Sequence, residues 1–158
     1  MSDQISASEA CEAAGCVAST LRAWHNRVGF LPRSTGGWRR YNLADVIAIR
    51  CMVVLTERGF RAAEAAGLVD SLTEQIKHAA AGHPSKIAIG KFRGSEYWVA
   101  EEIDEIASAG IALDFDDEFT IVLNLGEICF RLFDEIRRLR GQPPIYLSFK
   151  SHDDDRGE

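Results

Sequence analysis

The chain has 158 residues, of which 46% are hydrophobic and 27% charged, a composition typical of a globular protein rather than a disordered tail. It lacks the run of about 18 apolar residues that crosses a membrane, and its first residues, Met1-Ser2-Asp3-Gln4, do not resemble a secretory signal. The four cysteines have no CxxC or zinc-ligand spacing, so we expect reduced thiols, no metal and no cofactor. These observations favour a cytoplasmic protein and argue against the secreted, membrane and zinc-finger classes.

Positive charge is concentrated near the start of the chain, although the net charge is −6. Residues 1–72 hold eight arginines, no lysine and seven acidic residues, whereas residues 73–158 hold ten basic and seventeen acidic residues. Five of the eight arginines lie between residues 22 and 40, in a stretch that lacks Asp and Glu and is interleaved with aromatic residues. Because a phosphate backbone is bound by a local basic patch, the acidic net charge does not exclude a nucleic-acid ligand.

The first part of the chain has the pattern of a helix-turn-helix. Ser6-Ala7-Ser8-Glu9 fits a capping box, which predicts a helix over residues 7–14. Gly15 follows at the position where a left-handed residue would end this helix. A second helix is expected over residues 18–27, because its apolar residues share one helical face. Two short helices joined by a short turn are typical of the helix-turn-helix motif.

The residues that follow complete the plan of a winged helix-turn-helix domain over residues 1–73. Gly36-Gly37 predicts a tight hairpin between two extended segments. Asn42 can cap a third helix that continues to about residue 58, and the Ala-rich residues 61–72 predict a fourth helix. The order helix, turn, helix, hairpin, helix, helix is that of a compact winged helix.

The second half of the chain predicts a small α+β region. We expect a linker over residues 74–85, strands around 87–89, 97–99 and 119–123, and a short helix over 101–109. From Leu125 the pattern is plainly helical, and apolar residues step alternately by four and three, as in a coiled-coil seam of about two heptads. The predicted fold is therefore mainly α with a small β component. It comprises the winged helix-turn-helix domain, an α+β region over residues 86–158 and a C-terminal dimerisation helix whose interface is formed by Leu125, Cys129, Leu132, Ile136 and Leu139.

Two segments resemble the DNA-binding domain of the MerR family of transcription regulators. They are Thr20-Leu21-Arg22-Ala23-Trp24-His25-Asn26-Arg27-Val28-Gly29-Phe30-Leu31-Pro32 and Gly36-Gly37-Trp38-Arg39-Arg40-Tyr41. The resemblance covers about residues 6–72, and it departs from the family pattern at His25, where a Glu is usual, and at Val17, where a small polar cap is usual. It implies a winged helix that binds between promoter elements and distorts the DNA, with RNA polymerase as a further partner. The metal-sensing cysteines of one branch are missing.

The candidate DNA contacts lie on the second helix and the hairpin. A helix fits the major groove, where Ser, Thr, Asn and Arg reach base edges or phosphates. A hairpin tip approaches the backbone closely, so Arg39, which can hold a phosphate with two hydrogen bonds, is our first choice. The spacing of Trp24 and Leu21 favours packing, although the resemblance implies that the Trp24 ring lies near the DNA. The candidates are Ser19, Thr20, Arg22, Trp24, His25, Asn26, Arg27, Arg33, Arg39, Arg40 and Tyr41.

Three functions remain open at this point. The first is a homodimeric, sequence-specific regulator that binds double-stranded DNA in the bacterial nucleoid. The second is a DNA-architectural factor, such as an excisionase-like recombination protein or a phage packaging protein. The third is a small-molecule-binding module in residues 86–140. We expect no enzyme, because no spacing suggests a nucleophile–base pair and no Gly-rich phosphate loop is present in the sequence.

Overall fold

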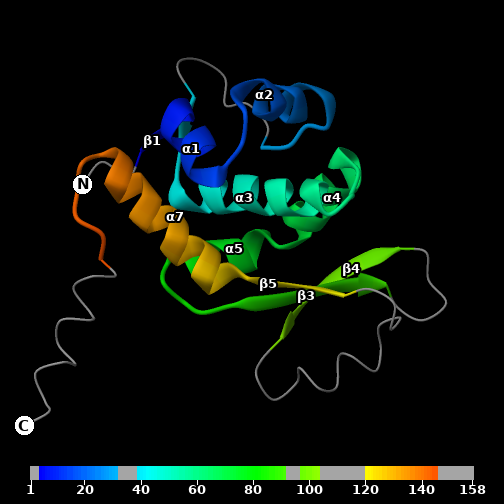
Figure 1. Ribbon diagram of the computed structural model, residues 1–158. Helices are drawn as coiled ribbons and strands as arrows, with labels where there is room; N and C mark the ends of the chain where they lie inside the picture. Colours follow the sequence, from blue (N-terminus) through cyan, green and yellow to red (C-terminus); the bar gives the residue numbers. More distant parts are fainter. Residues whose placement is uncertain (1–3, 32–38, 92–96, 104–119, 146–158) are drawn as a thin grey trace, which may run out of the picture.

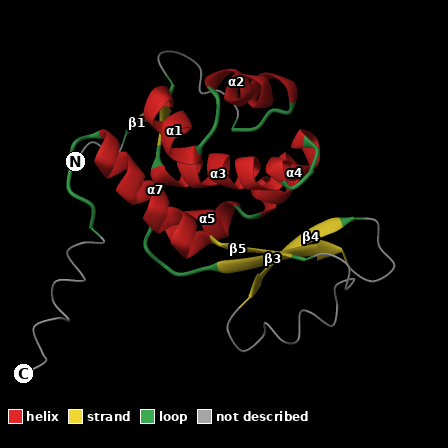
Figure 2. Ribbon diagram, viewed as in Figure 1, coloured by secondary structure: helices red, strands yellow, loops and turns green. Residues whose placement is uncertain are grey.

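The computed structural model describes residues 4–31, 39–91, 97–103 and 120–145, which form a cluster of helices on one side of a small sheet (Figures 1 and 2). The helices are α1 (Ala7–Ala14), α2 (Ala18–Arg27), α3 (Leu43–Glu57), α4 (Ala62–Ser71), α5 (Thr73–Ala80) and α7 (Leu125–Leu139). The strands are β1 (Ile5–Ser6), β2 (Arg40–Tyr41), β3 (Lys86–Lys91), β4 (Trp98–Ile103) and β5 (Ile121–Asn124). None of the described helices is both long and apolar enough to span a membrane.

The helix α3 is the centre of the fold. Its side chains Ile47, Ile49, Met52 and Leu55 are fully buried, and α1, α4, α5 and α7 all pack against it. A helix that is apolar on most of its circumference is expected to be covered on most sides. This packing fixes the elements of the predicted DNA-binding domain relative to one another.

Local signals set the helix ends as the sequence predicted. The Ser6 hydroxyl accepts a hydrogen bond from the Glu9 amide, and the Glu9 carboxylate accepts one from the Ser6 amide at 2.8 Å, which confirms the capping box. Gly15 ends α1 with φ of +70°, a conformation that costs residues with a Cβ more than glycine. Asn42 caps α3 through a reciprocal pair of bonds with Asp45.

The base of the predicted wing pairs with the start of the chain. The strand β2 is antiparallel to β1, with Tyr41 opposite Ile5 and Arg40 opposite Ser6. The expected Gly36-Gly37 turn lies outside the described residues. The described part of the predicted wing is therefore β2, which is joined to the strand that leads directly into α1.

The second half of the chain differs from the predicted pattern in two places. Residues 73–80, most of which fall in the expected linker 74–85, form α5 and pack against α3 and α7. Residues 101–103, where a helix was expected to begin, belong to β4 and pair with β3, with Glu102 opposite Ile87. Pairing with a neighbouring strand outweighs the weak helix preference of this acidic run; the rest of the predicted helix lies outside the described residues.

The expected strands around 87–89, 97–99 and 119–123 correspond to β3, β4 and β5, which form an antiparallel sheet in the order β4-β3-β5. Ile87 and Ile89 of the central strand are fully buried. The ring centroid of Trp98 on β4 lies 4.6 Å from that of Phe60, which stands two residues before the fourth helix, α4. The sheet thus shares one hydrophobic core with the helices.

The predicted dimer seam lies largely inside the chain, which corrects the assignment of α7. Leu125, Leu132 and Ile136 are buried and pack in the core that α1, α3 and α5 build with α7. Cys129 is half-buried against the same core, and Leu139 is half-buried. A heptad pattern specifies an apolar face without specifying what covers it. Here, the chain's own helices cover most of that face.

The C-terminal end of α7 is tied to the first helix by a charged contact. The Nε atom of Arg140 donates to Oε1 of Glu9 at 2.7 Å, and its Nη2 donates to the carbonyl of Gln4 at 3.0 Å. The Arg140 hydrogen bond, followed by the Ser6 amide, lowers the pKa of Glu9 from 4.5 to about 2. The carboxylate that caps α1 therefore also anchors α7.

Candidate DNA interface

The helix α2 has one buried and one exposed face, and it lies on the side of α3 opposite the sheet (Figure 1). Leu21 and Trp24 face the core. Ser19, Arg22 and Asn26 are exposed, and their spacing of three and four residues places them in a row along the helix. Thr20 and Arg27 are exposed on the flank of the same helix. The exposed face carries the residue types that read base edges.

Trp24 belongs to the core, which corrects its place among the candidate contacts. Its side chain is 8% exposed, and its ring meets that of Phe30 edge to face at 6.2 Å between centroids. Burial of a large aromatic ring on this side holds α2 against the rest of the domain. The ring therefore positions the helix and does not lie on its exposed face.

His25 and Tyr41 are joined by hydrogen bonds inside the domain rather than forming an exposed contact surface. The Nδ1 atom of His25 lies 2.6 Å from the carbonyl oxygen of Phe30, and its Nε2 lies 3.0 Å from the Tyr41 hydroxyl. A carbonyl only accepts, so Nδ1 carries the proton, and in the neutral ring Nε2 accepts from the hydroxyl. Tyr41 is 3% exposed, and burial raises its pKa. These two hydrogen bonds join α2, the loop that follows it and β2.

Arg39 also turns toward the protein. Its Nη2 donates to the carbonyl of Leu31, and its guanidinium lies 5.1 Å from the centroid of the Tyr41 ring. Leu31 has φ of +47°, a left-handed conformation that is costly for a residue with a Cβ. Arg39 and His25 thus hold two consecutive carbonyls of the turn between α2 and the wing. The residue expected to be the strongest phosphate contact has a positioning role in the described structure.

Of the candidate arginines, those turned outward in the described residues are Arg22, Arg27 and Arg40, all of which are exposed. Within the described segments, none of the three has an acidic partner within 4.0 Å. Arg33 lies outside the described residues. Cations that no described carboxylate neutralises remain available to phosphates, so these three form the basic part of the candidate interface.

Arg50 is a positioning residue that the sequence did not predict. This arginine stands in the apolar helix α3, is half-buried, and donates from Nη1 to the carbonyl of Ala14 at 3.2 Å. A Cβ placed on Gly15 would lie 3.2 Å from the same nitrogen. The guanidinium therefore stabilises the turn between α1 and α2. A charged residue within an otherwise apolar helix, between Ile49 and Cys51, was the signal that could have revealed it.

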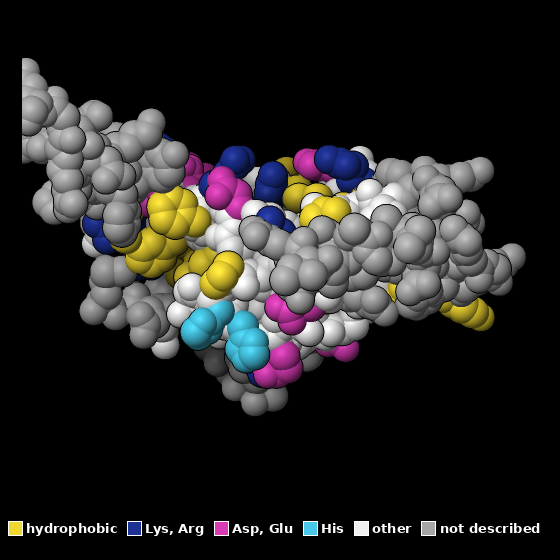
Figure 3. Space-filling model, turned by 90° about the horizontal axis from the view of Figure 1, so that it is seen from below, with side chains coloured by type: hydrophobic (Ala, Val, Ile, Leu, Met, Phe, Trp, Pro, Cys, Tyr) yellow, Lys and Arg dark blue, Asp and Glu magenta, His cyan; other side chains and the backbone are white. Residues whose placement is uncertain are grey.

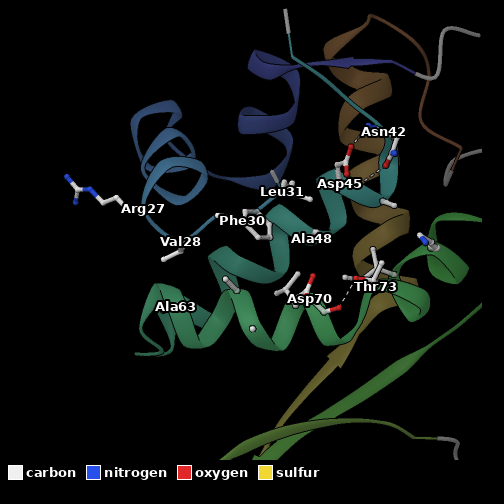
Figure 4. Close-up of a pocket in the computed structure, with 17 residues that line it drawn as sticks. Arg27, Val28, Phe30, Leu31, Asn42, Asp45, Ala48, Ala63, Asp70 and Thr73 are labelled. Atoms are coloured by element: carbon white, nitrogen blue, oxygen red, sulfur yellow. Dashed lines mark hydrogen bonds between the residues drawn. The ribbon is translucent and has the colours of Figure 1, made fainter. Parts of the chain in front are cut away.

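A groove of about 650 Å³ lies between the loop after α2 and the helices α3, α4 and α5 (Figure 4). Its walls are mostly small and apolar, with Ala48 and Ala63 among them. The Asp45 carboxylate at its edge accepts from the Asn42 amide, and the Thr73 hydroxyl donates to the carbonyl of Asp70 at 2.7 Å. These groups serve helix ends and turns. The groove is built from residues 27–77, outside the region 86–140 where a small-molecule site was considered.

Taken together, α1, its turn into α2 and the exposed face of α2 have the arrangement of a helix-turn-helix domain. Residues 5–72 match the family model of MerR HTH family regulatory proteins. The chain is also similar to the HTH-type transcriptional repressor CarH of Myxococcus xanthus, with 39% identity over 75 residues. That alignment covers 46% of this chain and 25% of the relative, so the match spans about a quarter of the relative's length. The match over residues 5–72 confirms the resemblance to the MerR family in this part of the chain.

Proposed function

We propose that the chain is a sequence-specific transcription regulator that binds double-stranded DNA as a homodimer. The observation that carries this proposal is the exposed face of α2, where Arg22 stands between Ser19 and Asn26 without an acidic partner among the described residues. The description of the relative from Myxococcus xanthus as a transcriptional repressor supports a role in transcription.

In this proposal α2 enters the major groove with Ser19, Arg22 and Asn26 toward the bases. Arg pairs with the two acceptors of guanine and Asn with the acceptor and donor of adenine, each good pair discriminating by about 1–3 kcal/mol. Arg27 and Arg40, at the helix flank and the wing strand, bind phosphates and set the register. Arg33, in the part of the wing outside the described residues, adds a further phosphate contact.

A homodimer would present two such helices to two half-sites, about 34–36 Å apart along one face of the duplex. Because the Leu125–Ile136 seam is used inside the chain, the dimer contact would draw on other surfaces. Phe130 and Phe133 of α7 are half-buried and lie off that seam. Distortion of promoter DNA and contact with RNA polymerase belong to the same proposal.

Selection of bound duplexes from a random pool by the full chain tests the proposal. We expect enrichment of one motif with two related halves, because two copies read symmetric half-sites. Genomic copies of the motif in promoter spacers would support transcription control. Their location at attachment or packaging sites would support the architectural alternative instead, and a failure to enrich any motif would contradict sequence-specific binding.

A further inference from the structure

Val17 is an exposed apolar residue at the start of the helix proposed to read DNA. The residue is 67% exposed, and among the described residues only Tyr97 and Val122 are comparably exposed large hydrophobics. Val17 is the one of these three that lies in the helix-turn-helix domain. It directly precedes α2, with φ of −78° and ψ of 137°, and no side-chain hydrogen bond closes this end of the helix.

The valine serves neither the helix nor the core. Ser6, Asn42 and Asn124 cap α1, α3 and α7 with side-chain oxygens, whereas Arg61 precedes α4 without such a bond. Leu72, which precedes α5 without capping it, is buried in the core instead. A hydroxyl or amide at position 17 would stabilise α2. The two methyl groups of Val17 have no such role inside the chain.

We propose that Val17 contacts the 5-methyl group of a thymine in the major groove and selects thymine at one base pair of each half-site. This inference rests on the proposed function. The N-terminal residues of a recognition helix are those that meet base edges. The thymine methyl is an apolar group on the major-groove edge, and small apolar side chains contact it. The exposed neighbours Ser19 and Thr20 provide polar groups for the major-groove edge of the adjacent base pair.

The test replaces thymine by deoxyuridine, which keeps base pairing and removes only the methyl group. The full chain is titrated with its selected duplex and with duplexes that carry deoxyuridine at one thymine position at a time. At one thymine of each half-site, the wild-type chain is expected to lose about fourfold in affinity, the effect of leaving one methyl group unburied. The other thymines are expected to change affinity by less than twofold.

Two substitutions connect the effect to Val17. Val17→Ala removes the methyl groups without adding a cap, and it should bind the thymine and deoxyuridine duplexes equally. Val17→Ser should also bind them equally and, by capping α2, should raise the melting temperature. Val122→Ala, an equally simple truncation of an exposed valine on β5, is the matched control and should retain the fourfold preference.

The outcomes separate this inference from the proposed function. If the wild-type chain enriches no motif, the proposed function fails first. If it enriches a motif but tolerates deoxyuridine at every position, or if Val17→Ala keeps the thymine preference, binding stands and the role of Val17 is overturned. Loss of the preference in both Val17 variants, and not in Val122→Ala, supports it.

Discussion

The arginines of the helix-turn-helix and those of α7 differ in what they face. Arg22 and Arg27 on α2 are exposed and have no acidic partner within the described segments. On α7, Arg131 pairs with Glu127 at 2.7 Å and Arg138 with Glu135 at 2.6 Å. Figure 3 shows the face of the molecule opposite α2, where basic and acidic side chains are interspersed. Whole-chain charge hides this difference, because unpaired cations attract a phosphate backbone and paired ones much less.

The largest loss of stability is expected from a substitution in α7, because the apolar face of this helix packs against the other helices of the chain. Leu132→Ala is expected to lower the free energy of unfolding by about 2–5 kcal/mol, because it leaves a cavity in the core. Urea denaturation followed by circular dichroism measures this, with sedimentation on the same sample. A variant that keeps wild-type stability but dissociates into monomers would restore the seam as an interface.

Removal of a cation from each region tests the comparison itself. Arg22→Ala should weaken binding to the selected duplex by about 1–3 kcal/mol and relax the preference at one base pair. Arg131→Ala, the control on α7, should change binding by less than twofold because its charge is already paired. Fluorescence anisotropy titrations measure both. Equal losses in the two variants would mean that the binding surface is not centred on α2.

Substitutions at Arg39 and Arg40 should distinguish an arginine that positions the loop from one that contacts DNA. Arg39→Ala is expected to destabilise the domain by about 1.5–3 kcal/mol, since a hydrogen bond from a charged group to the Leu31 carbonyl is lost. Arg40→Ala should leave stability nearly unchanged and reduce the slope of log affinity against log salt by about one, as for one lost phosphate contact. Thermal melts and salt titrations on both variants check this. If Arg39→Ala changed the salt slope and Arg40→Ala changed the stability, the inward role of Arg39 would be wrong.

The smallest effect concerns the contact between α1 and α7. The pKa of Glu9 is lowered from its ordinary value of 4.5 to about 2. The charge of Glu9 therefore stabilises the fold fully at pH values above 4.5, and this contribution is lost as the pH falls toward 2. Glu9→Gln keeps an oxygen for the cap but loses the charge, and it should cost up to about 1 kcal/mol at pH 7, since the pair is partly exposed. Urea denaturation between pH 7 and pH 3 should show the two proteins converging. A constant difference would mean that the Arg140 pair contributes nothing.

The elements with strong local signals were predictable from the sequence. The capping pair of Ser6 and Glu9, the left-handed Gly15 and the Asn42 cap each act within four residues, so their spacing sufficed to position α1 and α3. The strand over residues 101–103 was not predictable, because its partner β3 lies some fifteen residues earlier and pairing decided against the local helix preference.

The sequence predicted which elements form the site, but not which of their side chains face outward. Periodicity placed Arg22 and Asn26 on the exposed face of α2, where the structure has them. The inward turn of His25 and Arg39 depends on the path of the loop through Phe30 and Leu31, which no spacing rule contains. The same limit explains α7: the sequence shows an apolar face, whereas its cover depends on how the other helices pack.

The salt dependence of duplex binding tests the central claim most directly. The full chain is titrated with its labelled selected duplex at a series of salt concentrations. We predict that log affinity falls linearly with log salt, with a slope that reflects several phosphate contacts from the outward-facing arginines. Affinity that does not change with salt, or no binding to any duplex at low salt, would contradict the account.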